Sequence, residues 1–180
     1  MTDFSVLKEE FETILKELVL ARTPKNLIGL REMVSYHFGW NDPASKTGKR
    51  LRPMLLLASS HLFGGNPQEL IPAAVAMEVL HNYTLVHDDI EDEGETRHGR
   101  VCLWRQYGLA QSLNTGDFLS TMAHDIFFEV EPFVKPGDFK RAYAVFRQAS
   151  LGVLRGQYMD IHFEDESNVS VDDYLEMIHL

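Results

Sequence analysis

The sequence predicts an all-α fold. Apolar residues recur at spacings of three and four along most of the chain, which is the period of an amphipathic helix. No segment alternates apolar and polar residues as a half-buried strand would, and no hairpin signal of any weight is found. Of the 180 residues, 44% are hydrophobic and 24% are charged, which is typical of a folded globular protein. We therefore expect a single helical domain over residues 1–180.

In the first half of the chain, the pattern predicts three helices before the central one. The first ends before Pro24 and has an apolar stripe, and a shorter helix follows around residues 27–34. Residues 37–47 contain the glycine, asparagine and proline of a loop. Pro53 suits the first turn of the third helix, which the pair Gly64-Gly65 ends.

The central helix is expected from Pro72, where an apolar period begins that continues to about residue 88. Residues 94–105 show no clear period and are predicted to form a loop, and another helix follows over about 109–130. Asp138 is the expected cap of a long helix to about residue 163. Ser170 and Asp173 resemble a capping box for a last helix that reaches Leu180.

Composition excludes several classes of function. A net charge of −10 argues against nucleic acid and anionic membrane as partners. No apolar run approaches the roughly 20 residues of a membrane span, and residues 1–20 lack a signal-peptide pattern, so a cytoplasmic protein is expected. The single cysteine, Cys102, can form neither an internal disulfide nor a cysteine-based zinc site.

The segment at residues 80–92 leads from a helical apolar stretch into a cluster of carboxylates. At about 100° per residue, His81, Asp88 and Asp92 fall near one stripe of a helix, with Asp89 beside it. Carboxylates four apart on a helix repel each other, and hard oxygen ligands favour Mg²⁺ if a cation compensates. The alternative is a solvated acidic helix end, which is the commoner origin of such runs.

Basic segments flank this acidic cluster in the sequence. Residues 48–53 read GKRLRP, and residues 97–100 read RHGR. An acidic cluster between two basic ones indicates a metal ion that bridges to a phosphorylated ligand. Taken singly, GKRLRP is better explained as a solvated basic loop and His81 as a core histidine.

Four blocks in this order resemble the trans-isoprenyl diphosphate synthases, or polyprenyl synthetases. They are GKRLRP at 48–53, ExLHxxxLxHDDxxD at 78–92, Arg97 five positions after Asp92, and GQYMD at 156–160. The resemblance implies a helical bundle of the isoprenoid synthase type, Mg²⁺ as the cofactor and a homodimer. It also implies that an allylic diphosphate ionises to a carbocation and is attacked by isopentenyl diphosphate.

The resemblance assigns a role to each matched residue. Asp88, Asp92 and Arg97 would carry catalysis, and Asp88, Asp89 and Asp92 would bind the metal ion. Tyr83 and Thr84 would limit the product to fifteen to twenty carbons, although Tyr83 is equally explained as a core aromatic. The substrate-binding set is Lys49, Arg52, His81, Arg97, His98 and Gln157, although Gln157 is equally explained by a structural polar contact.

Two further residues are expected to have no direct part in the chemistry. Arg50 is expected at the surface. Gly116, in a Gly-Asp pair that also fits the family pattern, is expected to permit a close contact between helices.

The chain also departs from the family pattern. His98 stands where most relatives carry a second arginine, and Val101-Cys102 replaces a Pro-Thr pair. The Lys-Thr pair and the second aspartate-rich motif do not occur, so we expect a bundle that is incomplete at its C-terminal end. Two interpretations remain open: the amino-terminal part of a prenyltransferase, inactive or weak alone, or a noncatalytic regulatory subunit of a heteromeric synthase. A third is an unrelated Mg²⁺-dependent diphosphatase.

Overall fold

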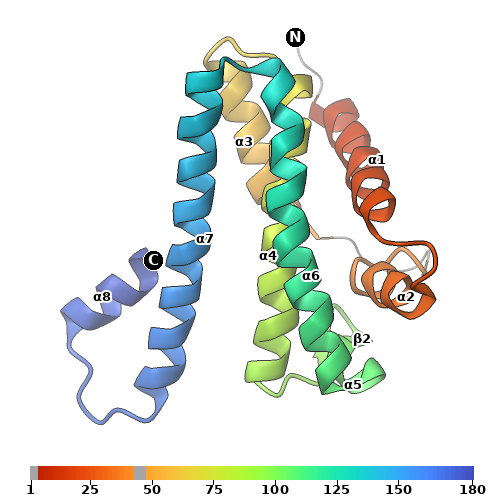
Figure 1. The fold of residues 1–180 in the computed structure, drawn as a ribbon. Coiled ribbons are helices and arrows are strands. Elements are labelled where there is room, and N and C mark those ends of the chain that lie inside the picture. Colours follow the sequence, from red (N-terminus) through yellow and green to blue (C-terminus); the bar gives the residue numbers. More distant parts are fainter. Residues whose placement is uncertain (1–3, 43–47) are drawn as a thin grey trace. The chain divides into compact units, whose positions relative to one another are not determined.

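The computed structural model of the protein describes residues 4–42 and 48–180, so part of the predicted loop at 37–47 lies outside the described residues. The described chain is predominantly helical, as predicted (Figure 1). Its contacts divide it into two compact units, Met1–Phe133 and Val134–Leu180. The single domain expected over residues 1–180 stays a prediction.

Helices α4 (Ile71–Glu91) and α6 (Leu109–Phe127) form the centre of the first unit (Figure 1). Small residues bring them close together. A Cβ atom on Gly116 of α6 would lie 2.3 Å from the His87 ring of α4, so no larger residue fits there without a shift. This confirms the close helix contact predicted for Gly116.

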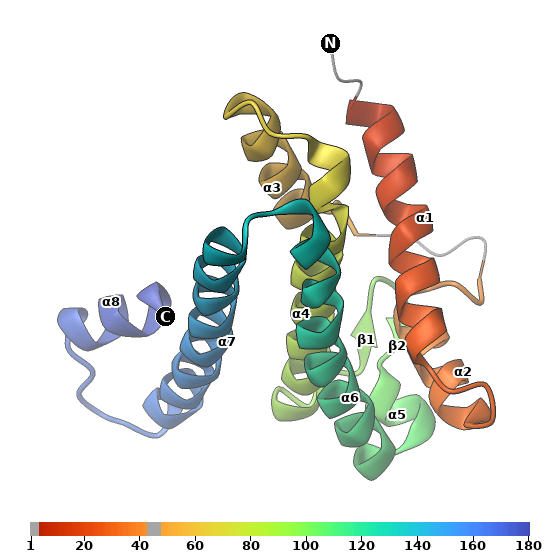
Figure 2. The ribbon, with the colours of Figure 1, turned by 45° about the horizontal axis from the view of Figure 1, so that its top comes forward.

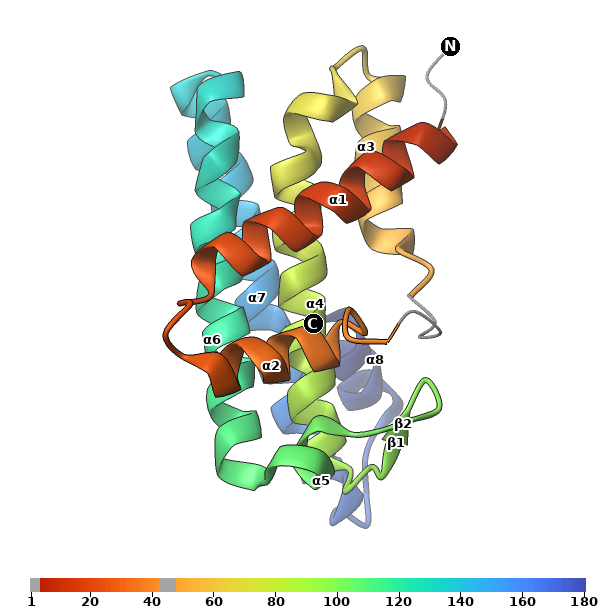
Figure 3. The same cartoon turned by 90° about the vertical axis from the view of Figure 1, so that its right-hand side faces the viewer.

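Helices α1 (Phe4–Arg22) and α2 (Ile28–His37) lie across this central pair, as Figure 3 shows. Helix α1 ends before Pro24, as predicted. Its contact with the core is one stripe at four-residue spacing, which a helix places on a single face. The buried residues of this stripe are Leu7, Phe11, Leu15 and Val19.

Helix α3 (Leu51–Leu62) begins two residues before Pro53, with Arg50 as its N-cap. The backbone of Arg50 is left-handed, with φ 56° and ψ 36°, a conformation that a non-glycine residue adopts at a cost. A 3₁₀ turn, η1 (Pro67–Leu70), then leads into α4, and the Asn66 side chain caps it by accepting a hydrogen bond from the Gln68 amide.

The expectation of no hairpin was wrong for residues 96–101. Strands β1 (Thr96–Arg97) and β2 (Arg100–Val101) pair antiparallel beside α4, followed by the short helix α5 (Leu103–Tyr107) (Figure 2). His98 and Gly99 both have positive φ, 54° and 81°, which is the geometry of a two-residue turn that follows strand twist. Strands of two residues are too short to show an alternating pattern in the sequence.

The C-terminal end of α6 continues into a 3₁₀ helix, η2 (Phe128–Phe133), which ends the first unit. The second unit consists of α7 (Pro136–Glu164) and α8 (Val171–His179). The capping box of Ser170 and Asp173 is confirmed. The N-cap of α7 is Lys135, not Asp138, because Pro136 already occupies the first helical position.

Glycines set the approach of the two helices in the second unit. A Cβ atom on Gly152 would lie 2.6 Å from the Leu180 carbonyl oxygen, and one on Gly156 would lie 3.2 Å from that of Met177. Helix α7 therefore meets the end of α8 at its glycines. In the residues described here, no helix is both long and apolar enough to cross a membrane.

Candidate functional site

A cavity of about 300 Å³ lies within the first unit. Its walls come from the end of α2, the segment before α3, one face of α4, and the β1–β2 hairpin. Five of the six predicted substrate-binding residues line it, although the sequence separates them by up to 49 positions. They are Lys49, Arg52, His81, Arg97 and His98.

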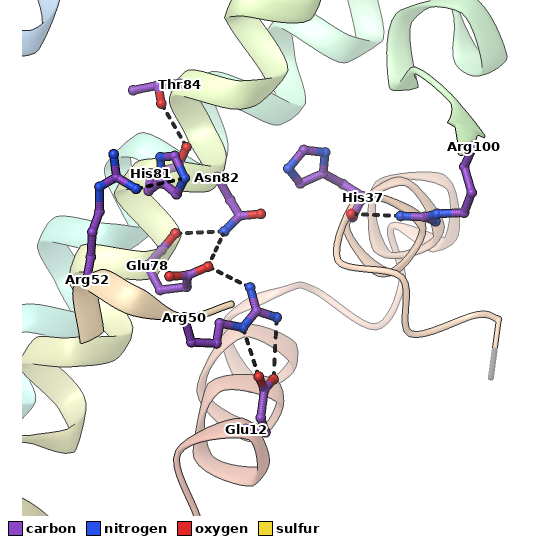
Figure 4. Close-up of polar contacts among 9 residues, drawn as sticks. All are labelled: Glu12, His37, Arg50, Arg52, Glu78, His81, Asn82, Thr84 and Arg100. Atoms are coloured by element: carbon purple, nitrogen blue, oxygen red, sulfur yellow. Dashed lines mark hydrogen bonds and ion pairs between the residues drawn. The ribbon is translucent and has the colours of Figure 1, made fainter. Parts of the chain in front are cut away.

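Helix α4 supplies the floor of this cavity. Its lining residues follow one another at spacings of one to four, which places them on one helix face. Figure 4 shows how the side chains of Glu78, His81 and Asn82 extend from this face toward those of the neighbouring segments. The complete set from α4 is Glu78, His81, Asn82, Leu85 and Asp89.

Arg52 and His81 lie next to each other at the cavity, with Nη1 of Arg52 3.4 Å from Nε2 of His81 (Figure 4). Burial and the charge of Arg52 lower the pKa of His81. The imidazole is therefore neutral at pH 7, and its Nε2 can accept a hydrogen bond from Arg52. His81 thus holds the Arg52 guanidinium at the cavity without neutralising its charge.

Arg50 is buried, so the prediction of a surface position was wrong. Its Nε lies 2.8 Å from Oε1 of Glu12, and its Nη1 lies 2.5 Å from Oε1 of Glu78 (Figure 4). Burial alone would lower the pKa of Arg50, but the hydrogen bonds and charges of Glu12 and Glu78 outweigh burial and raise it. No local pattern indicates this ion pair, because the partners of Arg50 lie 38 and 28 positions away in the sequence.

Arg97 and Asp89 form a two-point ion pair at another wall of the cavity. Nε of Arg97 lies 2.9 Å from both carboxylate oxygens of Asp89, and Nη2 lies 2.7 Å from Oδ1. The hydrogen bond to Asp89 is the main reason that the pKa of Arg97 is raised. Asp89 is buried at 6% exposure, so its carboxylate is committed to Arg97 in this structure.

Asp88 and Asp92 lie at the end of α4, with Asp88 half-buried and Asp92 exposed at the C-cap. Neither lines the cavity. Burial and the neighbouring carboxylates of Glu91 and Asp92 raise the pKa of Asp88 to about 6. Such a concentration of negative charge fits a divalent cation, which would relieve the repulsion.

The described residues do not, however, gather three or more His, Cys, Asp or Glu side chains around one point where a metal ion could bind. The reason within the predicted set is that Asp89 faces Arg97. The assignment of Asp88, Asp89 and Asp92 to a metal ion stays a prediction.

The remaining predicted residues are not among those that line the cavity. Tyr83 is buried at 9% exposure, and its ring packs edge-on against that of His87 at 4.8 Å between centroids. The Thr84 hydroxyl donates a hydrogen bond to the His81 carbonyl. Gln157 belongs to α7 in the second unit.

The structure also brings residues to the cavity that the motifs did not assign. The Arg100 guanidinium donates to the carbonyls of Tyr36 and His37 and lies 5.0 Å from the Tyr36 ring centre, which ties the hairpin to α2. Burial lowers the pKa of His37 to about 4. Burial and a hydrogen bond to Asp89 raise the pKa of the Cys102 thiol to about 11.

Of these unassigned residues, only Glu78 and Asn82 carried a signal in the sequence. Glu78 lies three positions before His81 and four before Asn82, spacings that place both partners of Glu78 on its own helix face. Asn82 donates hydrogen bonds to the backbone and side chain of Glu78, which orients that carboxylate toward Arg50. The positions of His37 and Arg100 depend on how α2 and the hairpin dock, which no local pattern reveals.

Comparison with known proteins identifies the family. The model of the polyprenyl synthetase family matches residues 39–180. The chain belongs to this family. It is 36% identical over 154 residues to a (2E,6E)-farnesyl diphosphate synthase from Mycobacterium tuberculosis, a match that covers 82% of this chain and 42% of the relative.

Solved structures agree with this assignment. A geranylgeranyl pyrophosphate synthetase from Pyrococcus horikoshii superposes with a TM-score of 0.84 at 34% identity, over 97% of this chain and 51% of that one. A polyprenyl synthase from Caulobacter crescentus, complexed with calcium and isoprenyl diphosphate, gives 0.78 at 27% identity, over 97% and 49%. This polyprenyl synthetase chain thus spans about half the length of the relatives it matches, and its isoprenoid synthase fold is confirmed.

Proposed function

We propose that this protein acts in the condensation of an allylic diphosphate with isopentenyl diphosphate, to give a prenyl diphosphate of fifteen to twenty carbons. The observation that carries the proposal is the cavity, where basic residues from GKRLRP and from the hairpin meet His81 of α4. Relatives named farnesyl and geranylgeranyl diphosphate synthases support this reaction class. Homodimer formation and a cytoplasmic location stay predictions.

The cavity suits the diphosphate of isopentenyl diphosphate. Lys49 and Arg52 would bind the phosphate oxygens, since an ammonium and a guanidinium together offer several charged donors. His81 would contribute as the neutral partner of Arg52, and His98 would offer a weaker contact from the hairpin turn. A volume of about 300 Å³ is at the lower end for small-molecule sites, which favours one small substrate.

The allylic diphosphate would bind at the carboxylates of α4. Asp88 and Asp92 have the donor chemistry for Mg²⁺, which would supply positive charge to the departing pyrophosphate. Arg97, at the boundary between this end of α4 and the cavity, would bind the same diphosphate through the part of its side chain that is still exposed. Asp89 would orient Arg97 for that contact.

The reaction needs no protein nucleophile, so the role of the chain is to bind and orient. Two diphosphates repel each other, and separate groups for each would hold them apart: Lys49 and Arg52 for one, and Arg97 with the metal ion for the other. Tyr83 would limit the length of the growing chain, five positions before Asp88 on α4. Gln157 on α7 is proposed as an allylic-side contact from its match to the family pattern.

Calorimetric titration of the chain with isopentenyl diphosphate tests the cavity. We expect saturable binding at one site, weakened tenfold or more by Lys49→Ala, since a hydrogen bond to a charged group contributes about 1.5–3 kcal/mol. Lys25→Ala, which removes an exposed lysine before α2, is the matched control and should not change the affinity. Equal binding by Lys49→Ala would remove the cavity from the proposal.

Catalysis is tested separately by incubating the protein with Mg²⁺, dimethylallyl diphosphate and isopentenyl diphosphate. As expected from the sequence, this chain alone should form elongated prenyl diphosphates weakly or not at all, and any such product should be lost on Asp88→Asn or Asp92→Asn. Turnover at ordinary enzyme rates would contradict the expectation of a weak or inactive chain. Release of inorganic phosphate without a new carbon–carbon bond would indicate a diphosphatase instead.

A further inference from the structure

The three basic side chains of GKRLRP do not share one environment. Lys49 and Arg52 are exposed residues at the cavity. The Arg50 side chain, between them in sequence, is only 5% exposed and lies between Glu12 of α1 and Glu78 of α4. The segment therefore presents two charges to the cavity while a third is buried in an ion-pair network.

The buried contact fixes the backbone at this point. Arg50 has the left-handed φ of 56°, a conformation that costs about 1 kcal/mol or more and persists only when its surroundings hold it. The guanidinium meets two carboxylates on two different helices, so the side chain cannot rotate without losing one of them. The turn that separates Lys49 from Arg52 is therefore held in place by Glu12 and Glu78.

Glu12 is the partner that the family pattern does not include. It lies on α1, outside the matched residues 39–180, and its side chain is 27% exposed. Glu78, by contrast, is buried at 6% and also accepts a hydrogen bond from Asn82. A change at Glu12 can thus loosen one side of Arg50 and still leave its charge neutralised by Glu78.

We propose that Arg50 and Glu12 are positioning residues for diphosphate binding: the pair holds the turn so that Lys49 and Arg52 face the cavity together. The inference rests on the proposed function and adds α1 to the substrate-binding unit. Neither residue needs to touch the substrate.

The sign of one substitution separates positioning from simple electrostatics. Glu12→Gln removes a negative charge near the cavity, which by Coulomb's law alone would strengthen the binding of an anionic diphosphate. If Glu12 positions the turn, the same substitution weakens binding, because Arg50 loses one of its two charged partners and the turn gains freedom. The two effects have opposite directions.

The experiment is calorimetric titration of the 180-residue chain with isopentenyl diphosphate, together with thermal unfolding of each variant. For Glu12→Gln we expect the Kd to rise about fivefold, which corresponds to about 1 kcal/mol. Glu9→Gln makes the same chemical change at an exposed position on α1 and should leave the Kd unchanged. Gly116→Ala, which disturbs the α4–α6 contact elsewhere, should lower the melting temperature with little effect on the Kd.

Each outcome decides the inference. An unchanged or lower Kd for Glu12→Gln, with wild type binding normally, would overturn the positioning role and leave the proposed function intact. So would a loss of affinity in Gly116→Ala as large as that in Glu12→Gln, since the effect would then follow from stability alone. No binding by the wild type would overturn both. If Glu12→Gln does not fold, Glu12→Asp takes its place, because the charge stays while the carboxylate is withdrawn from Arg50.

Discussion

Arg97 binds the carboxylate of Asp89 at two points, with Nε 2.9 Å from both oxygens and Nη2 2.7 Å from Oδ1. Asp89 is the middle member of the acidic cluster that ends α4, and the family resemblance assigns it to the metal ion together with Asp88 and Asp92. In the structure it differs from them, because it is buried and paired. Its first role in this chain is to hold the hairpin to α4.

Asp89→Asn is therefore expected to lower the free energy of unfolding by about 2–3 kcal/mol. The value lies below the ~3–5 kcal/mol for breaking a fully buried pair, because the Arg97 side chain is still 31% exposed. Urea denaturation measures the change. Glu95→Gln is the control, since its ion pair with Arg105 is exposed and should contribute less than about 1 kcal/mol. Equal effects would contradict a structural role for Asp89.

Gly116→Ala is expected to destabilise the first unit by about 1–3 kcal/mol, because the new methyl group would overlap the His87 ring. The same change at Gly29, an exposed position in α2 with no atom within 4 Å of the added Cβ, should stabilise the protein by up to about 1 kcal/mol through helix propensity. Thermal unfolding compares the two. If Gly116→Ala does not change the stability of the protein, α4 and α6 can move apart at no cost in free energy, and the prediction is wrong.

His37 should make folding stability depend on pH. Its pKa is about 4 in the folded protein and 6.5 when unperturbed, so protons bind the unfolded state first as the pH falls. The buried neutral His37 therefore contributes fully to the free energy of unfolding above pH 6.5. As the pH falls from 6.5 to 4, this contribution decreases by up to about 1.4 kcal/mol for each pH unit. The measured quantity is the difference in unfolding free energy between wild type and His37→Gln across this range.

That difference is needed because Asp88 acts in the opposite direction. Its folded pKa of about 6 lies above the ordinary 3.8, so acidification from pH 6 to 4 favours the folded state at this residue. Both proteins share the Asp88 contribution, and it cancels. A difference that does not change between pH 7 and 4 would contradict the burial of the His37 ring.

Tyr83→Ala is expected to lengthen the prenyl products if the protein elongates them as proposed, because the ring that packs on His87 would be replaced by a methyl group. Chromatography of the dephosphorylated products measures their length. Tyr83→Phe keeps the ring and should keep the wild-type distribution. Tyr83→Ala products of unchanged length would support the alternative in which Tyr83 is only a core aromatic.

Much of the helical fold could be predicted because its signals are local. The four-residue stripe of α1 and the capping box of α8 each depend on residues within a single helix and its cap. The hairpin could not be predicted in the same way, since its strands of two residues carry no period. Its turn depends on His98 in a left-handed conformation, which is uncommon for residues other than glycine, although histidine adopts it more often than most.

The candidate site likewise has features that are local in the sequence and features that depend on tertiary packing. The sequence by itself determined which side chains could bind diphosphate, because Lys49, Arg52, His81 and Arg97 carry their chemistry wherever they lie. Only the tertiary structure decided which of them meet at the cavity, that Arg50 is buried between Glu12 and Glu78, and that Asp89 is held by Arg97. Charge and helix periodicity are properties of neighbouring residues, whereas an ion pair across helices depends on how those helices pack.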